Sequence, residues 1–208
     1  MAEVKIAADS GGGSVGLVGP ASTTSNAAVQ FKLPVADGSA SQVLKTDGSG
    51  NLSWYTLLDN SPAFAAYQRE PDFGGNQTVQ NDTWTALTPS QEEYDTDSAY
   101  NTSTGEFVVP ANKGGKFHFN GFARSGGIDA GEQMSLKLYK DTGSGYSAIE
   151  WTETISFEDS TTHGSHGHSM HATLSLNAGD KIKLYGWHNE GDWQYFSIMR
   201  FSGYRLVL

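Results

Sequence analysis

The sequence contains no cysteine, and charged residues make up only 17% of its 208 residues. Without cysteine, neither disulfides nor thiolate-bound metals can stabilise the protein. No stretch approaches the ~18 apolar residues of a membrane span, so we expect no membrane insertion. The first ten residues also lack a basic region followed by an apolar run. We therefore expect no secretory signal and synthesis in a cytoplasm.

Basic residues are scarcer than acidic ones: the chain has 13 basic and 23 acidic residues, which gives a formal net charge of −10. A field of this sign repels phosphate backbones and anionic lipid, so we expect no nucleic-acid partner. Glycine, in contrast, occurs 25 times, and aromatic residues make up 12% of the chain. Few charges and many turn-forming residues favour strands over helices, and the aromatic rings supply the apolar area that disordered chains lack.

From about residue 61 onward, apolar and polar residues alternate with a period of two. The run MSLKLYK alternates Met134, Leu136 and Leu138 with more polar neighbours. Similar runs recur roughly every ten residues, separated by turn sequences such as DTGSG and NAGD. This pattern predicts an all-β fold over residues 61–208, either a sandwich or a jelly roll, and we expect a ten-stranded jelly-roll sandwich. We expect the core between its two sheets to contain Phe117, Phe119, Leu136, Leu138, Leu174, Leu176, Ile182 and Leu184.

Residues 1–60 are rich in glycine, serine, alanine and aspartate and have too few apolar residues for a core of their own. Alternating apolar residues nevertheless continue between turns at Asp37-Gly38 and Asp47–Asn51. Such a stripe can be buried by winding around two identical copies, which predicts an extended, intertwined stem in a homotrimer. A disordered linker is the alternative. The residues expected to form the trimer contacts are Phe31, Leu33, Val43, Leu44, Leu52 and Trp54.

The run KLPVADGSASQVLKTDGSGNLSW resembles a short module found near the N-termini of bacteriophage fibre and other virion proteins. The shared positions are Leu33-Pro34, Asp37-Gly38, Gln42–Leu44, Thr46–Gly48, Gly50 and Leu52–Trp54. Ala40-Ser41 departs from the module, which commonly has a glycine before the glutamine. The resemblance implies a virion protein, made in the host cytoplasm, that attaches to other virion proteins through residues 1–60. It leaves the position in the particle open.

The block YNTSTGEFVVPANKGGKFHF, followed by AGDKIKL and FSGYRLVL, resembles the globular head of the complement first component and its tumour-necrosis-factor-like relatives. The resemblance covers roughly residues 62–208, with departures at Lys116, at Gly121 and in a longer histidine-rich loop. It implies a jelly roll that forms tight homotrimers, with one sheet of each protomer against the three-fold axis. Several aromatic residues exceed what one sandwich needs and are expected partly between protomers: Trp84, Trp151, Tyr185, Trp187, Trp193, Tyr195 and Phe196.

Four of the six histidines lie in the segment THGSHGHSMHA, at His163, His166, His168 and His171. In a strand, His166 and His168 project to one face and His171 to the other. Near a three-fold axis, the His166/His168 pair would offer six imidazoles, a ligand set that first-row transition metals favour. The alternative is a metal-free polar loop exposed at the trimer apex.

Two further groups of residues are candidate ligand sites. The cluster Trp187–Trp193 is expected on the loop between the last two strands, where tryptophan beside polar side chains can hold a sugar ring. Packing of both tryptophans between protomers is the alternative. The candidate ligand-binding residues are Trp187, His188, Asn189, Glu190, Asp192 and Trp193. Asp95 and Asp97 would serve calcium at the apex, or else form a solvated acidic loop.

No nucleophile elbow, phosphate-binding loop or zinc-protease pattern occurs, so we expect no enzyme and no required cofactor. Three hypotheses remain. The protein is a bacteriophage tail, neck or head fibre whose head adheres to host-surface glycans, or a capsid decoration protein, or a lectin-like module unconnected with a virus. The missing secretory signal weighs against the third hypothesis.

Overall fold

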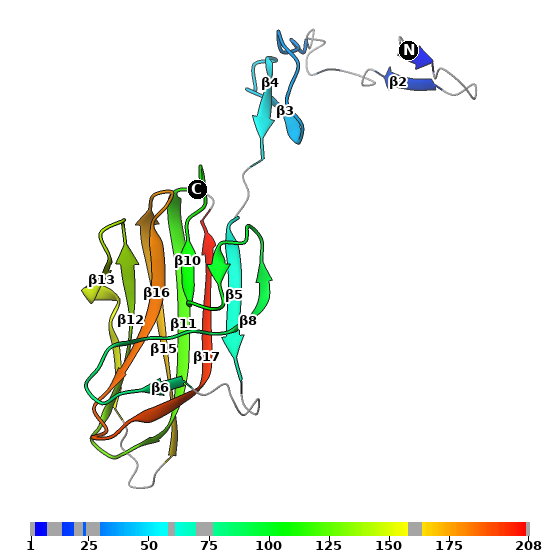
Figure 1. The fold of residues 1–208 in the computed structure, drawn as a ribbon. Helices are drawn as coiled ribbons and strands as arrows, with labels where there is room; N and C mark the ends of the chain where they lie inside the picture. The colour runs from blue at the N-terminus through cyan, green and yellow to red at the C-terminus, as the bar shows by residue number, and fades with distance from the viewer. Residues whose placement is uncertain are drawn as a thin grey trace. The chain divides into compact units, whose positions relative to one another are not determined.

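The computed structural model describes residues 3–7, 14–18, 23, 30–57, 61–69, 77–157 and 164–206. The chain divides into two compact units, Met1–Leu58 and Asp59–Leu208, which we call the N-terminal unit and the head (Figure 1). Over the described ranges, the regular elements are strands and one short 3₁₀ helix, η2 (Glu150–Thr152). No helix there has the length and apolar character that a membrane crossing requires.

The N-terminal unit consists of two antiparallel hairpins. The first pairs β1 (Glu3–Ala7) with β2 (Ser14–Val18), and the second pairs β3 (Gln42–Thr46) with β4 (Leu52–Thr56). The turn of the second hairpin is closed by Asp47, whose Oδ1 accepts the backbone N–H groups of Ser49 and Asn51 at 2.8 and 3.1 Å. An aspartate in this position stabilises a tight turn without any apolar core.

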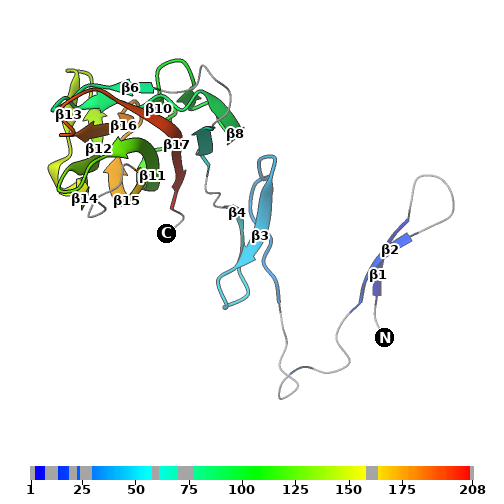
Figure 2. The ribbon, with the colours of Figure 1, turned by 90° about the horizontal axis from the view of Figure 1, so that it is seen from below.

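The head is a sandwich of two antiparallel sheets, which Figure 2 shows from below, along the strands. The first sheet, called the β11 sheet, has the order β15-β11-β17-β5-β8, with β6 paired to β17. Its strands are β5 (Ala63–Gln68), β6 (Gln77–Val79), β8 (Gln91–Asp95), β11 (Gly115–Ile128), β15 (Gly164–Leu176) and β17 (Gln194–Arg205).

The second sheet, called the β12 sheet, has the order β13-β12-β16-β10-β9, with β14 paired to β12 and β7 to β16. Its strands are β7 (Thr85–Ala86), β9 (Tyr100–Asn101), β10 (Glu106–Val108), β12 (Gln133–Asp141), β13 (Tyr146–Ala148), β14 (Thr154–Phe157) and β16 (Lys181–His188). The main paths contain five strands each, as in the expected ten-stranded sandwich, and the short strands β6, β7 and β14 bring the two sheets to six and seven strands. Successive strands such as β15, β16 and β17 alternate between the sheets, and this is the connectivity of a jelly roll.

Two segments in which polar and apolar residues alternate are each interrupted by a turn. The segment TVQNDTWTAL divides into β6 and β7, which belong to different sheets, because Asp82 adopts a left-handed conformation with φ of 51°. The segment YSAIEWTETISF divides into β13 and β14 around η2, because the Thr152 hydroxyl donates to the Ile149 carbonyl at 2.7 Å and closes a turn. Alternation of polar and apolar residues alone does not reveal either turn.

The core lies between the sheets and confirms the expected residues. All eight predicted core side chains are buried. The largest contacts surround Phe64 of β5, whose ring centroid is 4.9 Å from those of Tyr100 and Phe107 and 5.1 Å from that of Phe201. Tyr100 and Phe107 belong to the β12 sheet, whereas Phe201 belongs to the β11 sheet. These rings therefore join the two sheets directly.

Three inward-facing glycines make room for these large side chains. An added Cβ would lie 2.5 Å from a Phe119 ring carbon at Gly203 and 2.5 Å from a Phe196 ring carbon at Gly186. At Gly121, a Cβ would lie 2.7 Å from Leu184. A glycine at position 121 is thus required by the packing of this core.

We predict that Phe64→Ala lowers the free energy of unfolding of the head by about 3–5 kcal/mol, because it removes a buried ring that contacts both sheets. Trp193→Ala, at a side chain that is 45% exposed, should change it by less than ~1 kcal/mol. Chemical denaturation followed by circular dichroism measures both. Equal losses in the two variants would contradict the central role of Phe64.

Candidate functional site

The outward face of the β11 sheet carries aromatic, histidine and basic side chains. Because side chains alternate across a strand, the residues that do not face the core point away from the sandwich. The register places Phe122 beside Arg200 and Ser169, and Arg124 beside Ile198. We call this surface the basic face. Its members on the three strands β15, β11 and β17 are Lys116, His118, Asn120, Phe122, Arg124, Ser169, His171, Thr173, Ile198, Arg200, Ser202 and Tyr204.

The basic face has a charge opposite to that of the whole chain. Its charged members are Lys116, Arg124 and Arg200, and none of its members is an aspartate or a glutamate. The chain nevertheless carries a formal net charge of −10. A surface of this kind favours an acidic partner and disfavours a basic one.

A hollow lies within the basic face. Phe122 and Ile198 supply its apolar lining, and Arg124, Arg200 and His171 line it as well. An apolar surface flanked by guanidinium groups suits an aromatic side chain, because arginine can stack on a ring while its charge stays hydrated. The hollow is therefore shaped for an aromatic or aliphatic group with a negative charge nearby.

Two histidines stand side by side on the basic face. The rings of His118 and His171 are nearly parallel, at 8°, with centroids 6.4 Å apart. The Nδ1 atom of His171 lies 2.7 Å from the Asn120 Oδ1, and that of His118 lies 3.1 Å from the Thr173 hydroxyl. These bonds fix both rings in place, which lowers the entropy that they lose when a partner covers them.

The predicted metal ligands His166 and His168 lie on the other side of β15. The two side chains do share one face, as expected, but it is the inner face, which they share with buried Met170. His166 Nε2 lies 2.6 Å from the hydroxyl of Ser156 in β14, so this histidine joins the edges of the two sheets. An axis along the basic face would thus meet His171 and His118 rather than the predicted pair.

The described part of the chain contains no group of three or more histidine, aspartate or glutamate side chains arranged to hold a metal. His163, the fourth histidine of the cluster, lies outside the described residues. A transition metal at His166 and His168 would need further ligands from another chain or from water.

The predicted sugar-binding cluster is divided between a strand and a loop. Trp187 and His188 belong to β16, and only the residues that follow form the loop. His188 is fully buried, with its Nε2 2.9 Å from the Val79 carbonyl, so it has no surface to offer to a ligand. Its Nδ1 accepts the Glu190 N–H at 3.3 Å, which requires the tautomer that is protonated at Nε2.

Most polar groups of this loop are used inside the protein. Asn189 Oδ1 accepts the Gln133 N–H at 2.6 Å, and Glu190 Oε2 accepts the Asp129 N–H at 2.7 Å. Both bonds fasten the loop to the neighbouring one. Trp193 is 45% exposed and meets Tyr195, also 45% exposed, with ring centroids 4.7 Å apart. Of the predicted cluster, Asp192 and Trp193 remain exposed to a ligand, and Tyr195, which was not among the predicted residues, pairs with Trp193.

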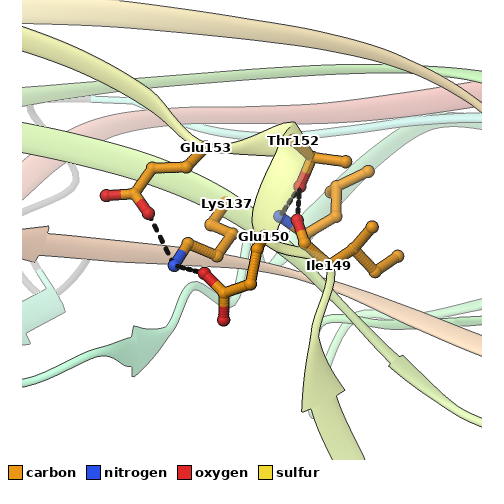
Figure 3. A network of polar contacts seen from close by, with 6 residues as sticks. Lys137, Ile149, Glu150, Thr152 and Glu153 are labelled. Atoms are coloured by element: carbon orange, nitrogen blue, oxygen red, sulfur yellow. Dashed lines mark hydrogen bonds and ion pairs between the residues drawn. The ribbon is translucent and has the colours of Figure 1, made fainter.

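The outward face of the β12 sheet is covered in part, by side chains around Trp84 and Lys137. The rings of Trp187 and Trp84 stack at 6.2 Å, and the Lys137 ammonium lies 4.5 Å from the centre of the Trp84 ring. Figure 3 shows the same ammonium between two carboxylates, Glu150 and Glu153, each at 2.6 Å. Lys137 is only 5% exposed, and a lysine is buried to this degree only when its charge is paired.

The Lys137 cluster was not identified from the sequence. Burial lowers the pKa of Lys137, but hydrogen bonds to Glu150 and Glu153 raise it by more, so the lysine stays charged. Lys137 occupies an ordinary outward position in the alternating run MSLKLYK. The sequence signal that could have indicated a paired lysine was the spacing of Glu150 and Glu153, which places both on the same side of a single helical turn.

The acidic pair Asp95 and Asp97 has a structural role in this fold. The Asp95 carboxylate accepts the N–H groups of Asp97 and Tyr100, at 3.3 and 2.8 Å. Asp97 in turn accepts the Thr96 hydroxyl at 2.8 Å. The bonds hold the loop between β8 and β9 in place, and a calcium ion would compete with them for the same oxygens.

The predicted trimer-contact residues of the N-terminal unit are largely exposed. The exposed fractions of Phe31, Leu33 and Leu44 are 66%, 72% and 46%, and those of Val43 and Trp54 are 40% and 38%. Leu52 is half-buried. Trp54 is held by its Nε1–H, which donates to the Ala36 carbonyl at 2.8 Å. Side chains of this size are seldom left in water in such numbers unless a partner covers them.

Comparison with known proteins yields structural matches only. No protein-family model matches the chain, and no curated protein matches its sequence. The globular domain of the zebrafish complement 1qA protein is similar over 71% of this chain and 98% of its own, at 20% identity and a TM-score of 0.49. Eiger TNF from S. frugiperda is similar over 70% and 94%, at 14% identity and a TM-score of 0.45. Murine APRIL is similar over 69% and 99%, at 10% identity and a TM-score of 0.46.

We predict that acid destabilises the head through His168. Burial, together with the nearby His166, holds the pKa of His168 below its usual value of 6.5. The unfolded chain therefore takes up this proton at a higher pH than the folded chain does. The contribution of His168 to stability is complete above about pH 6.5 and is lost as the pH falls below it.

The measurement is the free energy of unfolding at about pH 7.5 and about pH 5.5, in the wild type and in His168→Gln. The variant should lose less stability on acidification than the wild type does. Ser144→Gln, in the exposed turn after β12, is the control and should behave like the wild type. An identical pH dependence in His168→Gln and the wild type would contradict the prediction.

We predict that removing the two carboxylates of the Lys137 cluster lowers the free energy of unfolding more than removing the lysine does. Replacing Glu150 and Glu153 together by glutamine leaves a buried ammonium without its counter-charges and should cost about 3 kcal/mol. Lys137→Met should cost less than ~1.5 kcal/mol, because the Glu150 side chain is 74% exposed and returns to water. Denaturant unfolding of the variants tests this order, and the reverse order would refute it.

Proposed function

We propose that the protein is a homotrimeric structural and binding protein, in which the basic face of each head is covered by another copy of the chain. The observation that carries this proposal is the distribution of exposed apolar side chains. Seven of the fourteen large hydrophobic side chains that are exposed in the described residues lie between Phe31 and Leu57. A segment of this size has no core in which to bury these side chains. Packing against the same segment of a second and a third copy would bury them.

The basic face supports the same assembly in the head. It combines fixed rings, an apolar hollow and small residues such as Ser169 and Ser202, and such a surface allows close approach of another chain. Its lack of acidic residues matches a partner whose own surface is acidic, as the surface of this chain is. The proposal assigns assembly and binding to the protein, not catalysis.

We further propose that the trimer is an appendage of a bacteriophage particle. The support is the resemblance of residues 33–54 to a module of phage fibre proteins. In this proposal the N-terminal unit attaches to other virion proteins, and the head contacts host-surface glycans through the Trp193–Tyr195 pair. That pair lies at the opposite end of β17 from Arg205, whose N–H donates to Pro62 where the chain enters the head.

The trimer is tested by sedimentation equilibrium of the purified protein, whose chain mass is 22.3 kDa. The wild type should sediment as three chains. Phe122→Glu places a charge in the hollow of the basic face and should raise the dissociation constant at least about tenfold, with the circular dichroism spectrum unchanged. Ser144→Glu, in the exposed turn after β12, is the control and should remain trimeric. A monomeric wild type would refute the assembly.

The phage role is tested by electron microscopy of the particle that contains the protein. Density that protrudes from the tail, the neck or a vertex supports a fibre. Density that locks neighbouring capsomers at three-fold positions would instead establish the decoration protein.

For adhesion, fluorescently labelled trimer should stain host cells, and Trp193→Ala should reduce the staining. Equal staining by the variant would contradict the assignment of the glycan site to Trp193.

A further inference from the structure

A separate hollow lies at the border of the basic face, where β17 meets β5 and β8. Its volume is about 470 Å³, within the range of roughly 300–1,000 Å³ that is usual for small-molecule sites. We call it the Arg69 hollow. The residues of its lining that matter here are Ala65, Tyr67, Arg69, Glu93, Arg200 and Ser202.

The floor of the Arg69 hollow consists of small side chains. The register places Ala65 of β5 opposite Ser202 of β17, and Tyr67 opposite Arg200. These side chains point out of the sandwich, because Phe64 is buried on the other side of β5. A small pair next to a long pair leaves a depression over the small pair. The alternation of side-chain sizes along two strands therefore produces the hollow.

A β-bulge brings a carboxylate to the hollow. The pairing of β5 with β8 shifts between Ala65 and Ala66, and the extra residue of β8 at this point is Glu93. A bulge of this kind changes the direction of a side chain. Glu93 thus lines the hollow, although it belongs to the edge strand of the sheet.

The Arg69 side chain is positioned by Tyr67. Its guanidinium carbon lies 5.3 Å from the centre of the Tyr67 ring, which is a cation–π contact. Such a contact lowers the entropy that the long side chain loses when a ligand binds. None of the ion pairs among the described residues includes Arg69, Arg200 or Glu93, and all three side chains are exposed. Their charges are therefore available to a ligand.

The charge of the Arg69 hollow selects a monoanion. Two guanidinium groups and one carboxylate give a formal charge of +2 − 1 = +1, in a chain whose formal net charge is −10. This charge balances one carboxylate, whereas a phosphate monoester carries about −1.5 to −2 at neutral pH. A guanidinium group also binds a carboxylate through two parallel hydrogen bonds.

The other groups of the hollow complement a sugar. The Tyr67 ring and the Ala65 methyl group offer an apolar surface to the C–H groups of a pyranose. The Glu93 carboxylate accepts hydrogen bonds from sugar hydroxyls, and the Ser202 hydroxyl both donates and accepts them.

We propose that the Arg69 hollow binds an acidic sugar, such as a uronic or sialic acid, with the carboxylate held between Arg69 and Arg200. The hydroxyls of the sugar bond to Glu93 and Ser202. The site is distinct from the Trp193–Tyr195 pair, because Arg200 follows Tyr195 by five residues along β17, which corresponds to roughly 17 Å. It adds a second site and a ligand class to the proposed adhesion.

Three ligands that share one ring test the proposal: methyl glucuronide, methyl glucoside and glucose 6-phosphate. Calorimetric titration of the full-length protein at low salt, about 50 mM, keeps the charges unscreened and requires the ligand to reach the hollow in the assembled protein. The glucuronide should bind at least about tenfold more tightly than the glucoside, which lacks the carboxylate. Equal binding of these two ligands would overturn the inference. So would tighter binding of glucose 6-phosphate than of the glucuronide.

Variants of Arg69 locate the binding in the hollow. Arg69→Gln should weaken glucuronide binding at least about tenfold, and Arg69→Lys, which keeps the charge but not the two parallel bonds, should lie between it and the wild type. The matched control is Lys45→Gln in the N-terminal unit, where the lysine ammonium lies 4.5 Å from the Tyr55 ring. It removes one charge beside a tyrosine and should bind like the wild type. Equal losses in Arg69→Gln and Lys45→Gln would contradict the site.

The experiments separate this site from the proposed function. Sedimentation of the wild type decides the trimer, and cell staining by Trp193→Ala decides the Trp193 site. A trimer that stains cells but shows no preference for the glucuronide overturns only the Arg69 hollow. A monomer that binds the glucuronide through Arg69 supports the hollow and refutes the trimer.

Discussion

The contact of Phe64 with Tyr100 and Phe107 is the interaction on which the rest of the head depends. It joins the two sheets through rings with centroids 4.9 Å apart, and Phe201 closes the same cluster from the β11 sheet. Once these rings are buried, the period of two along each strand decides which side chains must point outward. This alternation places the residues of the basic face, including His118 and His171, on the outside. It places His166 and His168 on the inner side of β15. A slip of one residue would exchange every one of these surfaces with the core.

The outward faces of the two sheets differ in how far other side chains cover them and in charge, and the functional interpretation depends on this difference. The β12 sheet covers its own face with Trp84, Trp187 and the Lys137 cluster, because the segment between β6 and β7 and the helix η2 bring side chains onto it. The basic face on β15, β11 and β17 of the β11 sheet carries three basic and no acidic residues in an acidic chain, whereas β8 at the edge of the same sheet carries Glu92 and Glu93. The charge of the basic face is therefore the reason why we propose it as the surface for assembly.

Much of the fold follows from the sequence because it depends on local patterns. Period-two alternation and turn-forming residues are sufficient to predict a sandwich or jelly roll and its core residues, including Leu136 and Ile182. The turn at Asp82 and the helix η2 are not predictable in this way, since each depends on a single side-chain or backbone conformation. Propensity averages over several residues and does not resolve such positions.

The candidate site was less predictable, because it depends on which side of a strand is the inside. The histidine pattern correctly places His166 and His168 on one side of a strand. Whether that side faces an axis or the core is decided by the pairing of β15 with β11 and by the approach of Ser156 from β14. Similarly, His188 is buried because Val79, more than a hundred residues away in sequence, offers it a carbonyl. Contacts of this range are a property of the topology, not of the local sequence.

The two units of the chain strengthen each other in the proposed assembly. A segment of the size of residues 30–57 buries too little apolar area to be stable alone, and its trimer would be weak at low concentration. Linkage to a head that is itself trimeric turns the association of three stems into an intramolecular event at high effective concentration. The same linkage presents three Trp193–Tyr195 pairs together. Sugar sites built on one or two aromatic rings bind weakly one at a time, so a trimer of such sites gains adhesion through avidity that a single head cannot reach.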